Sequence, residues 1–71
     1  MDSIGERVKH IRLMHHLNQQ QFSATIHISQ GRLSEIEKNL CKPSAETLIS
    51  LSQEYKVNLN WLLLGEGEEL K

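Results

Sequence analysis

Apolar side chains recur along the chain at the three- and four-residue spacing of an α-helix. Ile4, Val8 and Ile11 form the first stripe, which predicts a helix from residue 4 to about residue 15. Four later segments follow the same spacing. Their apolar positions are Phe22 and Ile26; Leu33 and Ile36; Leu48, Ile49, Leu51 and Tyr55; and Leu59, Trp61, Leu62 and Leu63.

Polar residues that suit the first position before a helix stand ahead of these stripes, because their side chains can accept hydrogen bonds from free N–H groups of the first turn. These caps are Asp2 or Ser3, Asn18, Ser29, Ser44 and Asn58. His16 and Asn39 stand where helices end in a left-handed residue, and Pro43 and Gly65 interrupt the helical pattern. The sequence therefore predicts an all-α fold of five helices, with a tight turn at residues 27–28 and no strands.

The length of 71 residues suits one small domain. Charged residues and glycines crowd the segment after Gly65, as expected of a chain end that packs poorly. We therefore expect a domain over residues 1–67, and a frayed tail or the start of a linker over residues 68–71.

The charge is unevenly divided, although its sum is only −1. Residues 1–42 hold six of the eight Lys and Arg side chains and all four histidines, against four of the nine acidic ones, so the acidic surplus lies in residues 43–71. This is the distribution expected if the first part faces a polyanion. The lone Cys41 and the histidines show no metal-ligand spacing. We expect no metal, no cofactor, no membrane contact and a cytoplasmic location.

Two short helices joined by a tight turn, the second with a polar outer face, have the geometry that fits the major groove of DNA. The predicted base-reading residues are Gln30, Gly31, Arg32, Ser34 and Glu35. Glutamine suits adenine, arginine suits guanine and glutamate suits cytosine. Gly31 has no side chain, so the start of this helix can approach the DNA closely. Asn18 and Ser29, at the starts of the two helices, lie beside N–H groups that suit phosphates.

Several short motifs occur together, in an order and spacing that resemble the lambda repressor and Cro-like helix-turn-helix family, also called the XRE family. They are Ile4-Gly5-Glu6-Arg7-Val8-Lys9, Leu17-Asn18-Gln19, Ile28-Ser29-Gln30, Ile36-Glu37-Lys38-Asn39, Lys42-Pro43-Ser44, Glu46-Thr47-Leu48 and Asn60-Trp61-Leu62-Leu63. The resemblance implies a compact five-helix domain whose second and third helices form the helix-turn-helix.

The resemblance also assigns roles to individual residues. It implies that Gln19 contacts a phosphate and bonds Gln30, and that Arg12 and Glu37 form a structural ion pair between the first and third helices. The residues that it places on the DNA backbone after the third helix are Lys38, Asn39 and Lys42. His27 stands where the family usually has glycine.

These features predict a DNA-binding transcriptional regulator, a repressor of phage or bacterial type, that acts as a homodimer on a two-fold symmetric double-stranded operator. No catalytic constellation is present, so we do not expect an enzyme. Glu35 is equally well explained as a base reader or as a partner of Arg32. The alternative function is a protein-interaction module, such as an antitoxin, and a C-terminal sensor domain beyond these residues also stays open.

Overall fold

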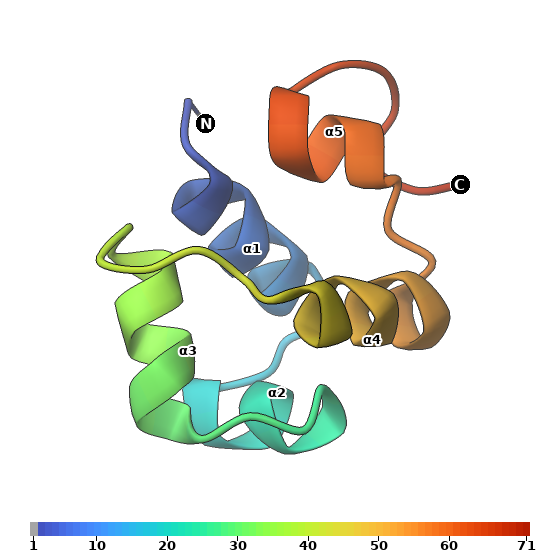
Figure 1. Cartoon of the computed structure of the whole chain (residues 1–71). Helices are drawn as coiled ribbons and strands as arrows, with labels where there is room; N and C mark the ends of the chain where they lie inside the picture. The colour runs from blue at the N-terminus through green and yellow to red at the C-terminus, as the bar shows by residue number, and fades with distance from the viewer. Residues whose placement is uncertain (1) are drawn as a thin grey trace.

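A computed structural model describes residues 2–71, and within them it has five helices and no strand longer than an isolated bridge. The helices are α1 (Ile4–Met14), α2 (Gln19–Thr25), α3 (Gln30–Glu37), α4 (Ala45–Tyr55) and α5 (Leu59–Leu64). The predicted all-α, five-helix fold is confirmed. Figure 1 shows α2 and α3 at one end of the molecule and α5 at the other, and α1 packs against both α3 and α5.

Each helix begins at a polar cap whose side chain accepts a hydrogen bond from a first-turn N–H group, which has no acceptor within its own helix. In α2 the capping is reciprocal. Asn18 accepts from the Gln21 backbone, and the Gln21 side chain accepts from the Asn18 backbone. The capping residues are Ser3, Asn18, Ser29, Ser44 and Asn58.

One hydrophobic core is shared by all five helices and the turn before α5. Its buried members are Val8, Ile11, Phe22, Ile26, Leu33, Ile36, Leu51, Val57, Trp61 and Leu62. Trp61, one of the apolar positions of the last stripe, is 7 % exposed. Not every apolar position of the stripes is inside, since Ile49 and Leu63 lie at the surface and Leu48 is half-buried.

The turns between helices use left-handed backbone, which non-glycine residues seldom adopt. His16 and Asn39 have φ values of 58° and 63°, as the sequence predicts, and His27 has a φ of 63° where the resembled family usually has glycine. These positions end α1, α2 and α3 abruptly, so that each following helix can turn back onto the core.

Gly5 lies against the end of α3. A β-carbon at this position would be 2.4 Å from the Ile36 carbonyl oxygen and 2.7 Å from the carbonyl oxygen of Glu37. The Gly5 N–H, a first-turn donor of α1, instead donates to the Asn39 side-chain oxygen over 2.9 Å. The Asn39 amide nitrogen in turn donates to Ser3 Oγ. The start of α1 and the end of α3 are thus fastened together directly.

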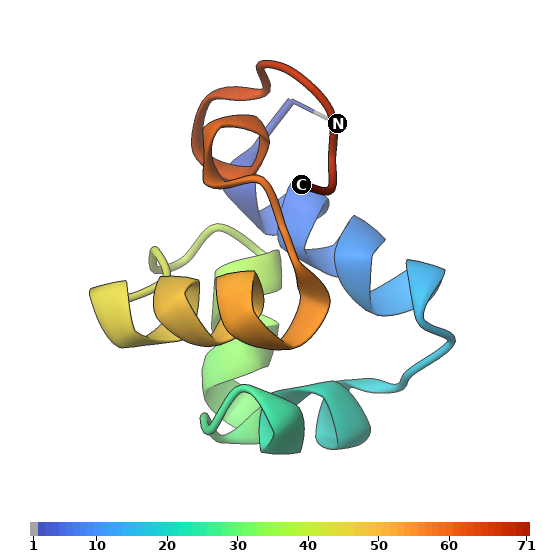
Figure 2. The same cartoon turned by 90° about the vertical axis from the view of Figure 1, so that its right-hand side faces the viewer.

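The chain after α5 returns alongside that helix (Figure 2). The Asn58 N–H donates to the Glu69 carbonyl oxygen and the Lys71 N–H to that of Lys56, each over 2.9 Å, and Val57 and Leu70 form an antiparallel bridge. Residues 68–71, expected to fray or to begin a linker, are therefore docked on the turn before α5. The tail forms backbone hydrogen bonds with residues 56–58, and these bonds hold it in place. Its charged, glycine-containing composition did not indicate them.

Arg7 is buried beside the end of α5. Its Nε donates to the Leu62 carbonyl oxygen over 2.7 Å and its Nη2 to the Leu63 carbonyl oxygen over 3.4 Å. The last carbonyl groups of a helix have no partner within it and carry its negative dipole end. The Arg7 guanidinium therefore supplies hydrogen bonds to carbonyl groups at the end of α5, and it holds this end against α1.

Candidate nucleic-acid interface

α2 and α3 form a packed pair connected by residues 26–29. Within the turn, the N–H groups of Ile26 and Ile28 both donate to the Ser23 carbonyl oxygen, over 3.3 and 3.1 Å. Phe22, Ile26 and Leu33 are fully buried between the two helices and the rest of the domain. Since this packing leaves α3 at the edge of the molecule (Figure 1), its outer face is open to a partner.

The outer face of α3 carries the residues that the sequence assigns to base reading. Gln30, Gly31, Arg32 and Glu35 are exposed, and Ser34 is half-buried. Within residues 2–71, the side chains of Gln30, Arg32 and Glu35 have no hydrogen-bond or ion-pair partner. Arg32 and Glu35 are therefore not paired with each other. All three retain their hydrogen-bonding capacity for a ligand.

The residues that the sequence assigns to the DNA backbone fall into two groups. Lys38 and Lys42 are exposed, and no carboxylate within residues 2–71 pairs with either lysine. Asn18, Ser29 and Asn39 use their side chains within the domain, the first two as helix caps and the third at the start of α1. The two lysines, like Arg32, are thus exposed cations without an acidic partner, whereas the side chains of the other three residues stabilise the backbone of this region.

Arg12 and Glu37, expected as an ion pair, join α1 to the end of α3. Arg12 Nε lies 2.8 Å from Glu37 Oε2 and Arg12 Nη2 lies 3.1 Å from Glu37 Oε1, which makes the contact bidentate. Only 10 % of the arginine side chain and 5 % of the glutamate side chain are exposed. Arg12 Nη1 also donates to the Leu17 carbonyl oxygen, just before α2.

No hydrogen bond joins the side chains of Gln19 and Gln30 in the described residues, contrary to what the resemblance implied. The Gln19 amide nitrogen Nε2 donates instead to Glu37 Oε1 over 3.1 Å. A carboxylate is a stronger acceptor than the neutral amide of a second glutamine, which explains the choice of partner. The resemblance paired Glu37 with Arg12 alone and did not indicate this second donor.

A family model described as a helix-turn-helix domain matches residues 5–68, which is most of the chain. The chain belongs to this helix-turn-helix family. The match spans α1 to α5, so the whole five-helix unit, and not only the α2–α3 pair, corresponds to the family. The resemblance inferred from the sequence motifs is thereby confirmed.

Among solved structures, this helix-turn-helix domain is similar to the P22 c2 repressor, whose crystal structure is that of a complex with the synthetic operator 9T in the presence of Tl⁺. The TM-score is 0.84 at 24 % sequence identity, over 93 % of this chain and 100 % of that one. The similarity shows that the two chains share a fold. No curated protein matches the chain.

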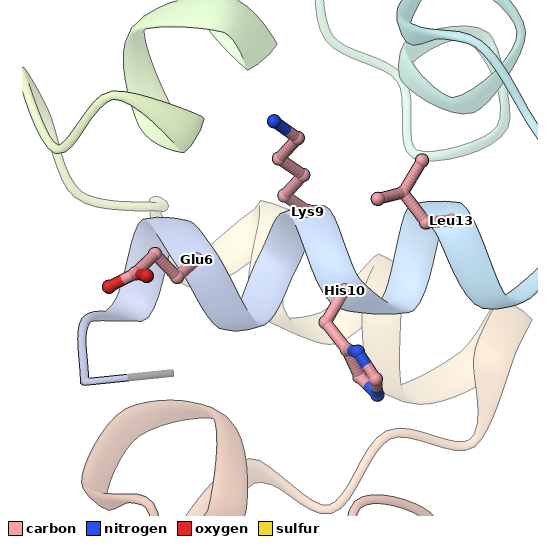
Figure 3. A pocket seen from close by; sticks show the side chains of 4 residues that line it. All are labelled: Glu6, Lys9, His10 and Leu13. Carbon is pink, nitrogen blue, oxygen red and sulfur yellow. The ribbon is translucent and has the colours of Figure 1, made fainter.

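Elsewhere on the helix-turn-helix domain, a shallow hollow runs along the exposed side of α1. It is lined by Glu6, Lys9, His10 and Leu13. Figure 3 shows that these side chains point in different directions, with Lys9 and His10 on opposite sides of the helix. Small-molecule sites need polar groups that converge on one point, and this hollow has none.

No three His, Cys, Asp or Glu side chains within residues 2–71 are grouped so that they could hold a metal ion. Over the same residues, no helix is long and apolar enough to cross a lipid bilayer. The outer face of α3 is therefore the best-defined candidate site of the domain.

Proposed function

We propose that the chain is a sequence-specific DNA-binding transcriptional regulator that acts as a repressor and inserts α3 into the major groove. One observation carries the proposal: the second helix of a helix-turn-helix presents exposed polar side chains that have no partner in the domain. The operator bound in the structure of the P22 c2 repressor, which has the same fold, supports it.

The three exposed polar side chains of α3 suit different base edges. The Gln30 amide offers a donor and an acceptor, which match N6 and N7 of adenine. Arg32 can donate both its outer N–H groups to guanine, or bind a phosphate, and the Glu35 carboxylate can accept from cytosine N4. Gln30 lies in the first turn of α3, the part of a recognition helix that reaches base edges.

Replacing Gln30 by alanine should relax base preference at one operator position only. On the preferred site we expect a loss of about 1–3 kcal/mol, and little loss on sites that already lack the adenine. Lys42→Ala should instead weaken all sequences equally and lower the salt slope by about one unit per protomer. The measurement is a binding series on operators varied at each base. A uniform loss with Gln30→Ala would show that Gln30 contacts the backbone and does not read a base.

Gly31 lies on the same face, and the space where its side chain would be is open within 4 Å. The protein therefore tolerates a methyl group here, whereas DNA that approaches the helix closely does not. We expect Gly31→Ala to fold at least as stably as the native chain and yet to bind its operator roughly tenfold more weakly, about 1.4 kcal/mol, as for other overpacked contacts. Titration of both proteins with the same duplex measures the difference. Unchanged affinity would show that Gly31 does not lie against the DNA.

A homodimer is the proposed binding unit, because one recognition helix covers only part of a turn of groove and two half-sites ~34 Å apart give useful affinity. α5 offers the apolar surface for it, since the Leu63 and Leu64 side chains are 36 % and 65 % exposed. Leu64→Lys should leave the fold intact and reduce affinity for a two-fold site roughly a hundredfold, as expected when bivalent binding is lost. Binding to a single half-site is the control, and it should not change. Equal affinity of both proteins for the two-fold site would rule out α5 as the dimer surface.

A protein-interaction module is the second candidate, and the net charge of −1 together with Glu35 on α3 favours it. Salt dependence separates the two functions. Arg7 and Arg12 of α1 are buried and cannot reach phosphates. The exposed cations of α3 and the following loop are Arg32, Lys38 and Lys42. A dimer that uses all of them should show a log–log salt slope of about −5 on duplex DNA. A slope near zero would favour a protein partner.

A further inference from the structure

The Glu37 carboxylate accepts N–H groups from two different helices. Arg12 of α1 donates from Nε and Nη2 over 2.8 and 3.1 Å, and Gln19 of α2 donates from Nε2 over 3.1 Å. Glu37 itself ends α3. Because its side chain is only 5 % exposed, water does not compete freely for these contacts. One carboxylate thus ties together the three helices nearest the proposed DNA interface.

This contact fixes the orientation of the Gln19 amide. Both oxygens of the Glu37 carboxylate accept from Arg12, and Oε1 also accepts from Gln19, so the group that Gln19 turns toward Glu37 is its NH₂ donor. A flipped amide would place its carbonyl oxygen against the carboxylate, which is repulsive. The NH₂ group has two hydrogens, and one N–H remains for another acceptor. Gln19 is half-buried, at the first residue of α2, so this group is within reach of solvent and ligands.

We propose that Glu37 is a positioning residue for DNA binding, which holds the Gln19 amide so that its second N–H donates to the DNA backbone. The inference rests on the proposed function. A glutamine side chain that is free to rotate loses conformational entropy when DNA binds. A side chain that Glu37 already holds in the free protein does not pay this cost on binding. Arg12 contributes to the same arrangement, since it binds Glu37 and also holds the Leu17 carbonyl oxygen just before α2. The ion pair that stabilises the fold therefore also sets the geometry of a backbone contact.

A double-mutant cycle tests the coupling. The protein that carries both Arg12→Met and Glu37→Leu lacks the carboxylate without stranding the buried guanidinium, and its net charge equals that of the native chain. The probe is a fluorescein-labelled mixed-sequence duplex of about 20 base pairs, long enough for two half-sites. In the native background Gln19→Ala should reduce affinity about tenfold, as for a hydrogen bond to a charged group. In the doubly substituted background, where the amide is no longer held, we expect Gln19→Ala to reduce affinity less than about twofold.

Equal losses in both backgrounds, or no loss in either, would overturn the inference, because Gln19 would then act without Glu37 or not at all. If the native chain itself shows no salt-dependent binding to the duplex, the proposed function fails first. The two failures are therefore distinguishable.

Glu37→Asp is the second variant, for the case that the double replacement does not fold. Its shorter carboxylate keeps the charge beside Arg12 but withdraws from Gln19, and the effect of Gln19→Ala should shrink in the same way. A spectroscopic readout accompanies both variants. In the DNA-free protein, the side-chain NH₂ resonances of Gln19 should move toward those of the exposed Gln20 when Glu37 is altered. Unmoved Gln19 resonances in a folded variant would contradict the positioning role, because they would show that Glu37 does not hold the Gln19 amide.

Discussion

Substitution of Gly5 by alanine is expected to destabilise the domain by about 3 kcal/mol, toward the upper end of the range for overpacked sites. The added methyl group would lie 2.4 Å from the Ile36 carbonyl oxygen and 2.7 Å from both the Glu37 carbonyl oxygen and the Asn39 side-chain oxygen. Two of these atoms are backbone of α3, so α1 would have to move away from α3 as a unit. Such a movement would also weaken the hydrogen bond from the Gly5 N–H to Asn39.

Gly31→Ala is the matched control, because it makes the same chemical change in another helix. No atom lies within 4 Å of the β-carbon that it adds, and alanine favours an exposed helix by up to about 1 kcal/mol over glycine. Urea unfolding should therefore show opposite shifts of the midpoint for the two variants. Similar midpoints for Gly5→Ala and the native chain would mean that α1 and α3 are not in close contact at this point.

Glu37→Ala should cost about 3–5 kcal/mol, because it leaves the Arg12 guanidinium buried without its carboxylate. This is a large part of the ~5–15 kcal/mol by which ordinary domains are stable, so the variant should unfold at a much lower urea concentration and temperature than the native chain. Urea or thermal unfolding followed by circular dichroism measures the loss.

Glu69→Ala provides the comparison for a pair that is more accessible to water. The Glu69 carboxylate lies 2.8 Å from His10 Nε2, with side chains that are 40 % and 32 % exposed. An exposed pair contributes about 0–1 kcal/mol, so this variant should unfold near the native midpoint. Equal stability of Glu37→Ala and Glu69→Ala would mean that the Arg12–Glu37 pair stabilises the fold no more than the His10–Glu69 pair does.

The helices could be predicted from sequence because their signals are local. The Ser29 side chain, for example, accepts from the Arg32 N–H three residues later, so a cap and its helix are visible in one short window. The apolar stripes are equally local, and they located α1 to α5 and most of the core. The helix-turn-helix followed from the short connection between α2 and α3.

The contacts that the sequence did not reveal join residues distant along the chain. Gly5 lies next to Ile36 although the two residues are far apart along the chain, and the sequence around one does not indicate contact with the other. Gln19 was expected to contact Gln30 but donates to the buried carboxylate of Glu37, whose exact position depends on the packing of α1 against α3. Charged, glycine-containing composition predicted a frayed tail, whereas a backbone pairing with Val57 holds it. These outcomes depend on tertiary geometry, which residue patterns encode only weakly.

Selection from a random duplex pool shows whether α3 reads DNA sequence. The native chain is incubated with the pool, the bound duplexes are recovered and sequenced over several rounds, and the Gln30→Ala protein is treated in parallel. We expect enrichment of a two-fold symmetric site with an adenine at a fixed place in each half, and loss of that adenine alone with Gln30→Ala. Retained sequences that match the starting pool would contradict sequence-specific recognition by α3.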